Sequence, residues 1–367
     1  MKQQKLYVCY SINDFYAREA GISLLGFLDN NPDYEPEEVF FIDYGIHPAN
    51  RERLNSITAR YGRRITYLDG KPVTDRVKHH FPNYPAWKGS MAACIKPFID
   101  EVIPDYVQRL LYIDADTVVV GSVSELKAMD MGEAVVAGTI SNTECHRLRR
   151  KEYELYSGNL IYMGTGVLLY DLSNWRRENC REMMYDVLRK KRRIRLPDQT
   201  LLNNAIPERL MKVLPTKYNY VTHTYHPWQE YHWLRQYRIY SKQECREAIR
   251  HPVIIHYLTG IGMCRPWHEG CLSHRKEAYY HYKALSPWKD SPLFPNQIEL
   301  YPPKGFYQKL DFWFIRTLSM PIPFFLAWLL YKVYCGVYFA SGFIITGEPD
   351  LPSEGKEAID NENVQLI

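Results

Sequence analysis

The 367-residue sequence predicts an α/β fold with a mainly parallel central sheet. Short apolar runs alternate with helical patterns through its first third, which is typical of strands joined by crossover helices. The chain is long enough to bury a large core, and its apolar content of 46% is ordinary for a globular protein. Two acids near the end of one apolar run, Asp114 and Asp116, fall where such sheets bind ligands.

Four strands are expected in the first third, each a short apolar run rich in β-branched or aromatic residues. They cover residues 6–11, 38–43, 64–69 and 109–119. Helical patterns lie between them, over residues 16–28, 49–62 and 90–103. Gly62 ends the second helix, and Pro97 ends or kinks the third because proline lacks a backbone N–H.

Three later segments carry polar residues at predicted turns. A strand over 166–172 follows a glycine-bearing turn, where the backbone can approach a ligand closely. Asp198 and Gln199 follow Pro197 at a helix start, where an acid is also a common N-cap. His256 ends another strand, and a histidine there is either structural or a metal ligand.

The sequence divides into a main domain over 1–275, a Pro-rich linker over 276–310, an apolar aromatic segment over 311–346 and an acidic tail over 347–367. The charge-free stretch 317–331 has 15 residues, about 22 Å as a helix, short of the roughly 30 Å hydrocarbon core. Helices lying on an anionic membrane surface fit it, although a true span and a hairpin packed on the domain stay open.

Composition limits which binding partners and which cellular compartment are expected for the protein. A net charge of +4 excludes a broadly basic protein, so no nucleic-acid partner is expected. Two basic runs, 146–151 and 189–195, are either solvated helix faces or contacts for anionic lipid or diphosphate. The eight cysteines have no framework spacing and the start has no signal-peptide pattern, so we expect a cytoplasmic main domain with reduced thiols.

The acid pair Asp114 and Asp116 is the most informative motif. If the strand continues through it, both carboxylates lie on one face, because strand side chains alternate. Two like charges in an apolar setting are costly unless a cation lies between them. Carboxylates suit Mn²⁺, or alternatively Mg²⁺, better than zinc, and such ions commonly bind phosphates as well. His256 is a candidate third ligand.

The turn after the first strand, "SINDFYA" at 11–17, offers hydrogen-bonding and stacking groups. Ser11, Asn13 and Tyr16 could hold a nucleoside there. The simpler interpretation is an ordinary helix cap by Asn13 or Asp14, and the sequence alone favours it. No glycine-rich dinucleotide fingerprint and no P-loop follows the strand.

The order of these motifs resembles glycosyltransferase family 8, the retaining nucleotide-sugar transferases of the GT-A fold that include bacterial lipooligosaccharide galactosyltransferases. The resemblance covers residues 6 to about 270 and rests on "SINDFYA", "LLYIDADTVVVGSVSEL", "GTGVLLYDLSNWR", "DQTLLN" and "HYLTGIGMCRPW". It implies a hexose transferred from a UDP-sugar to a glycan or lipid-linked glycan, usually with Mn²⁺. It also implies attachment to the inner membrane leaflet through a C-terminal segment.

The resemblance assigns roles to particular residues. The implied metal ligands are Asp114, Asp116 and His256. Gln199 and Asp198 match the pair beside the donor sugar, with Gln199 on the face where it could support displacement with retention. The remaining donor-binding residues implied are Ser11, Asn13, Tyr16, Lys88, Lys96, Ala115, Gly164, Thr165, Gly260 and Arg265.

The sequence departs from the family pattern near the donor sugar. Gly164 replaces the usual Asn, Ala92 stands where an Arg is usual, so that Lys88 or Lys96 substitutes for it, and Arg265 replaces a Lys. Metal and diphosphate binding are expected to be intact, while galactose or glucose as the donor sugar cannot be assumed.

Three alternatives stay open. "YIDADTVVV" also resembles the signature of HAD phosphohydrolases, although their later lysine and acid pair have no clear counterpart. A non-catalytic sugar-binding module would need no metal. Finally, Cys264, His268, Cys271 and His274 invite a structural zinc site, although their spacing matches no common finger.

Overall fold

The structure is a computed structural model. It describes residues 5–87, 89–141, 161–190, 194, 196–222, 240–258 and 265–296, and some residues between 309 and 333. Lys88, Gly260, Cys264 and the predicted acidic tail lie outside the described residues.

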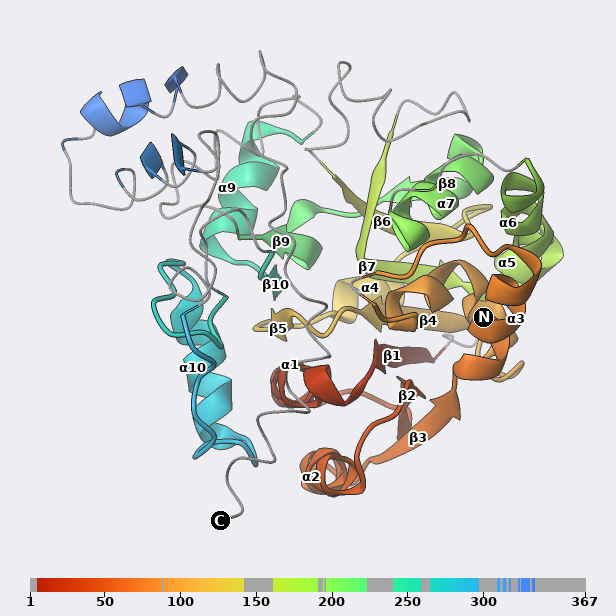
Figure 1. The fold of residues 1–367 in the computed structure, drawn as a ribbon, viewed down its shortest axis with the longest axis horizontal. Coiled ribbons are helices and arrows are strands. Elements are labelled where there is room, and N and C mark those ends of the chain that lie inside the picture. The colour runs from red at the N-terminus through yellow and green to blue at the C-terminus, as the bar shows by residue number, and fades with distance from the viewer. Residues whose placement is uncertain are drawn as a thin grey trace.

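A seven-stranded sheet forms the centre of the molecule, in the order β3-β2-β1-β4-β7-β6-β8 (Figure 1). β1 pairs in parallel with β2 and β4, β2 with β3, and β6 with β8, whereas β7 runs antiparallel to β4 and β6. The predicted mainly parallel α/β sheet is confirmed. Its strands are β1 (Leu6–Ile12), β2 (Glu38–Asp43), β3 (Arg64–Asp69), β4 (Arg109–Ile113), β6 (Val136–Ile140), β7 (Met163–Asp171) and β8 (Met211–Val213).

A three-stranded sheet lies beside the large one, in the order β5-β10-β9. It consists of β5 (Thr117–Val119), β9 (Tyr220–Val221) and β10 (Ile254–His256). The prediction of one strand over 109–119 is therefore wrong. The chain leaves β4 after Ile113 and enters the other sheet at Thr117, so the residues between them connect two sheets.

Helices cover both faces of the large sheet. Alternate residues of β1 explain this, since Val8 and Tyr10 are buried in one core cluster with α1 while Cys9 is buried in the other with η2. The helices are η1 (Asp14–Tyr16), α1 (Ala17–Asn30), α2 (Pro48–Ala59), α3 (Lys71–His80), η2 (Ala92–Glu101), α4 (Ser124–Ala128), α5 (Leu172–Arg177), α6 (Cys180–Arg189), α7 (Pro197–Ala205), η3 (Glu208–Leu210), η4 (Thr216–Asn219), α9 (Lys242–Arg250) and α10 (Lys276–Leu285).

The segment expected to be a helix over 90–103 is the 3₁₀ segment η2, kinked inside. Phe98, directly after Pro97, has φ −120° and ψ 25°, outside the helical region. Proline removes one backbone donor and its ring crowds the preceding turn, which accounts for the kink. The kink matters for the site because Lys96 lies next to it.

The predicted linker begins too early. Residues 276–285 form α10, which packs on α1, and its Tyr279 and Tyr282 are buried. Trp288 is also buried, and Gly21 of α1 makes room for it, since a Cβ there would lie 2.4 Å from the indole ring. The rest of the predicted division stays a prediction. Among the described residues, no helix has the length and apolarity needed to cross a bilayer.

Candidate active site

Asp114 and Asp116 lie at the junction between the two sheets. The backbone changes partners there: the Asp114 N–H donates to Gly166 O of β7 at 2.8 Å, and Asp116 O accepts from the Tyr257 N–H at 2.9 Å. The Thr117 hydroxyl also donates to Asp114 O at 2.8 Å. Both acids therefore stand at the carboxyl end of β4, where ligands bind in open α/β sheets, although no single strand carries them.

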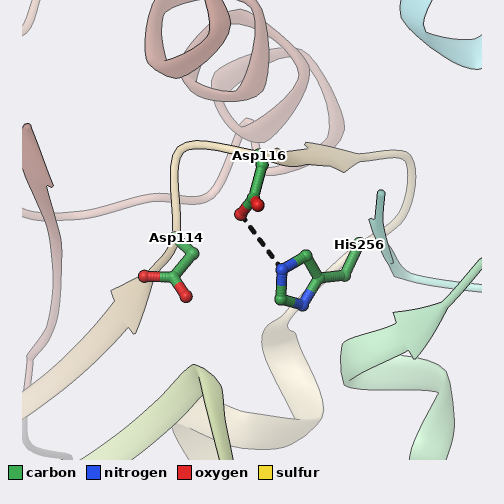
Figure 2. A group of neighbouring side chains, drawn as sticks. All are labelled: Asp114, Asp116 and His256. Atoms are coloured by element: carbon green, nitrogen blue, oxygen red, sulfur yellow. Dashed lines mark ion pairs between the residues drawn. The ribbon is translucent and has the colours of Figure 1, made fainter. Parts of the chain in front are cut away.

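The two carboxylates and His256 form one group. One ligand atom from each, Asp114, Asp116 and His256, lies within 4.8 Å of the others, so the three could hold a metal ion. Figure 2 shows Asp116 pointing at the His256 ring and Asp114 beside them at the end of β4. His256 Nε2 lies 3.0 Å from Asp116 Oδ1. The three predicted metal ligands are thus brought together from two sheets.

The chemistry of this group fits a divalent cation. Both ring nitrogens of His256 face oxygens, Nε2 facing Asp116 Oδ1 and Nδ1 lying 2.9 Å from Asn219 Oδ1. A neutral imidazole has one N–H, so it can satisfy one of these oxygens by donation. A cation held by Nε2 and the carboxylates would satisfy the other. Hard oxygen donors with one imidazole suit Mn²⁺ or Mg²⁺.

A buried guanidinium already balances Asp116. Arg265 Nη2 lies 3.2 Å from Asp116 Oδ2, and only 7% of the Arg265 side chain is exposed. Burial alone would raise the pKa of Asp116, but His256 and Arg265 lower that pKa far below its usual range. Asp116 is therefore a carboxylate, the form that a metal ligand requires.

Lys96 links the candidate metal-binding group, Asp114, Asp116 and His256, to Asp198. Its ammonium lies 2.8 Å from Asp114 Oδ1 and 2.7 Å from Asp198 Oδ2, and its side chain is 2% exposed. Burial lowers the pKa of Lys96, but the two carboxylates outweigh it and raise that pKa. For Asp114 burial dominates, and its pKa is raised despite Lys96. Lys96 was expected to touch the donor; the structure places its ammonium between two site carboxylates.

The sequence alternative that Asp198 caps a helix is wrong. Leu196 is the N-cap of α7, without a side-chain capping bond, and Pro197 begins the helix. The Asp198 carboxylate points instead to Lys96 and also accepts a 2.8 Å hydrogen bond from the Thr165 hydroxyl of β7. Gln199 follows in the same turn and is half-buried.

The turn after β1 does not act as the ordinary cap expected from sequence. Asn13 is the N-cap of η1 but makes no capping bond, and its buried Oδ1 has no hydrogen-bond partner among the described residues. Asp14 instead accepts hydrogen bonds at 2.8 Å from the His47 N–H and the Asn50 amide at the start of α2. Ser11 donates to Ala92 O at 2.8 Å.

Arg265 joins this turn to the candidate metal-binding group. Its Nη1 donates to the Tyr16 hydroxyl at 3.0 Å, while its Nη2 lies against Asp116. The predicted nucleoside turn and the predicted metal ligands are therefore neighbours. Ala115, between the two acids, is buried.

Comparison with known proteins identifies the family of this chain. The model of the family described as glycosyl transferase family 8 matches residues 7–271. The chain belongs to glycosyltransferase family 8. It is a glycosyltransferase, as the sequence predicts, and the phosphohydrolase alternative is set aside.

Relatives in family 8 cover most of the chain. General stress protein A of Bacillus subtilis is 24% identical over 78% of this chain and 96% of its own length. A lipopolysaccharide 1,2-glucosyltransferase of Escherichia coli is 24% identical over 79% of this chain and 81% of its own. The crystal structure of the galactosyltransferase LgtC with donor and acceptor sugar analogues matches with a TM-score of 0.62 at 20% identity, covering 77% of this chain and 96% of LgtC. That structural likeness confirms the GT-A fold.

Sequence analysis gave no role in the site to three residues that lie near it: Thr139, Gly166 and Asn219. Asn219 contacts His256, and a Cβ on Gly166 would lie 2.3 Å from the His256 ring. A Cβ on Gly164, where the family usually has Asn, would lie 3.8 Å from the Asn219 amide nitrogen. A lone Asn in "TKYNYV" follows no motif, so only the folded chain reveals it.

The zinc alternative gains nothing from the described residues. His268, Cys271 and His274 do not form a metal-binding group there, and the fourth predicted ligand, Cys264, is outside them.

Proposed function

We propose that this glycosyltransferase moves a hexose from a UDP-sugar to a glycan or lipid-linked glycan with retention, using a divalent cation, Mn²⁺ or Mg²⁺. The observation that carries the proposal is the Asp114–Asp116–His256 group beside Arg265 at the end of β4. A cation and a guanidinium side by side suit a diphosphate, because both neutralise charge on a leaving nucleotide.

The roles of the remaining residues follow from their positions. Tyr16 and Asn13, on the turn after β1, would hold the uridine, Asn13 through its unpartnered amide oxygen. Asp198 and Gln199, at the start of α7, would face the donor sugar, with Lys96 holding the Asp198 carboxylate in place. The names of the relatives support a hexose donor, since they include a glucosyltransferase and a galactosyltransferase.

The test measures UDP release from a panel of UDP-sugars by the purified full-length chain, with Mn²⁺, Mg²⁺ or EDTA. We expect release from at least one UDP-hexose that EDTA abolishes and Mn²⁺ restores. Asp116→Asn should reduce turnover by at least about 100-fold without unfolding the protein, because a metal ligand is lost. Release that EDTA leaves unchanged would remove the metal from the proposal, and a product of inverted configuration would remove retention.

We further propose that the C-terminal segment attaches the enzyme to an anionic membrane surface, on the cytoplasmic side. Phe325, Leu326, Leu329 and Val333 are all at least 44% exposed, and at 100° per residue they share one helix face. Ala327, on the opposite face, is 4% exposed and packs inward. A row of exposed apolar side chains of this kind suits a lipid interface.

Co-sedimentation with phosphatidylglycerol vesicles tests the attachment. The double substitution Phe325→Ser with Leu329→Ser should weaken binding at least tenfold, because two exposed apolar side chains are removed from the interface. Leu285→Ser is the matched control, because Leu285 is 50% exposed at the end of α10. Equal binding by both variants would refute the role of this face.

A further inference from the structure

Asn219 lies against His256, the histidine of the proposed metal site. We infer that Asn219 is a positioning residue that sets the tautomer of His256, so that Nε2 is the nitrogen offered to the metal. The inference rests on the proposed metal role of His256. It adds a residue from η4, far in sequence from both acids, to the machinery of the site.

The side chain of Asn219 makes two short hydrogen bonds in a buried setting. Its Oδ1 lies 2.9 Å from His256 Nδ1, and its Nδ2 donates to the Thr139 hydroxyl at 3.0 Å. Thr139, Asn219 and His256 are each at most 5% exposed, so water cannot easily replace these bonds. Buried polar groups of this kind are costly to leave unpaired, so the hydrogen bonds between Thr139 and Asn219 and between Asn219 and His256 hold these side chains in one orientation.

The orientation of the Asn219 amide favours one tautomer of His256. Thr139 belongs to β6 in the large sheet, so the hydroxyl that takes the amide N–H is anchored. With Nδ2 facing Thr139, Asn219 presents its oxygen, an acceptor, to His256 Nδ1. When Nε2 holds the metal, the imidazole proton stays on Nδ1 and is donated to the Asn219 oxygen; in the metal-free protein the Asp116 carboxylate, 3.0 Å from Nε2, competes for that proton. Nε2 is the nitrogen that faces Asp116.

Gly166 makes room for this arrangement. A Cβ on Gly166 would lie 2.3 Å from His256 Cε1, 2.5 Å from Nδ1 and 3.4 Å from Asn219 Oδ1. Such separations from the ring are far inside ordinary contact, so the ring can lie here only beside a glycine. The sequence thus provides both the space for His256 and the acceptor that orients it.

The experiment uses the full-length chain without sugar donor and compares two substitutions of one residue. Asn219→Leu removes the hydrogen-bond acceptor and keeps a side chain of similar size. Asn219→Asp keeps it, and the Thr139 hydroxyl can rotate to donate to the new carboxylate. Mn²⁺ affinity is measured by electron paramagnetic resonance, and the His256 Nδ1–H signal by ¹⁵N NMR of protein saturated with diamagnetic Mg²⁺, with the signal assigned by its loss in His256→Gln. Asn55→Leu on exposed α2 is the control for the same chemical change elsewhere.

We expect Asn219→Leu to lose about 10- to 100-fold in Mn²⁺ affinity and the Nδ1–H tautomer signal, whereas Asn219→Asp stays within about threefold and keeps the signal. Asn55→Leu should match the parent. Unchanged affinity and an unchanged tautomer in folded Asn219→Leu would overturn the inference. If the parent protein binds neither Mn²⁺ nor Mg²⁺, the proposed metal role fails; if the parent binds Mn²⁺ and folded Asn219→Leu binds it equally well with the same Nδ1–H signal, only the role of Asn219 fails.

Discussion

The placement of His256 against Gly166 makes a strong quantitative prediction. In Gly166→Ala the new Cβ would lie 2.3 Å from His256 Cε1 and 2.5 Å from Nδ1, where carbon atoms in contact normally lie about 3.5–4.0 Å apart. The strand cannot withdraw easily, because β7 is hydrogen-bonded to β4 on one side and β6 on the other. The imidazole ring must therefore move by about 1 Å or more.

A movement of that size exceeds what the proposed metal site can absorb. Ligand distances in metal sites vary by only about 0.2 Å, and a displacement of about 1 Å at a reacting group costs on the order of 100-fold. We expect Gly166→Ala to lower Mn²⁺ affinity by at least about 100-fold. Overpacking should also lower the free energy of unfolding by about 1–3 kcal/mol, which leaves the protein folded.

The control is the same substitution two residues earlier on the strand. A Cβ on Gly164 would meet its nearest neighbours at 3.6 and 3.8 Å, which is ordinary contact. Gly164→Ala should therefore keep its Mn²⁺ affinity within about threefold. Titration of both variants with Mn²⁺, followed by electron paramagnetic resonance, and thermal melts of the metal-free proteins make the comparison. Equal affinities for the two variants would refute the reasoning.

Two further predictions concern the unfolding free energy. Lys96→Met should lower it by about 3 kcal/mol in urea titrations at neutral pH, because the carboxylates of Asp198 and Asp114, whose side chains are 12% and 24% exposed, lose their common buried cation; a loss below about 1 kcal/mol would show that another group balances them. Tyr106→Phe removes a 2.6 Å hydrogen bond to Glu38. Burial raises the pKa of Glu38, but hydrogen bonds from Thr66 and Tyr106 lower that pKa overall, so their stabilisation is present at neutral pH and lost as pH falls through the lowered value. The deficit of Tyr106→Phe should be about 1 kcal/mol at pH 7 and shrink below about pH 4, and a pH-independent deficit would contradict this account.

Sequence patterns predicted the first three strands well because each is a short apolar run with polar ends. The same rule failed at Asp114 and Asp116, since the apolar residues on both sides look like one strand. The break is decided by β10, far away in the chain, and by Tyr257 directly after it, whose N–H donates to Asp116 O. Local periodicity contains no information about such a partner.

Sequence motifs predicted only some residues of the candidate site. Asp198 was placed at the correct helix start, but its ion pair with Lys96, 102 residues earlier, joins α7 to η2, and no motif predicts it. Asn219 was missed because one amide in an aromatic run has no pattern of its own. Such residues are defined by a distance in the folded chain, which sequence spacing does not supply.

The junction between the two sheets gives any bound metal a mechanical role. Its ligands come from the β4–β5 connection and from β10, so an ion held there would be a reversible cross-link closing a long loop of chain. Saturating it at about 100 times its dissociation constant would add about 2.7 kcal/mol of stability. The three-stranded sheet would then exchange its amide hydrogens more slowly in the presence of the ion. Chelation would remove this cross-link and speed that exchange, while exchange in the large sheet would stay the same.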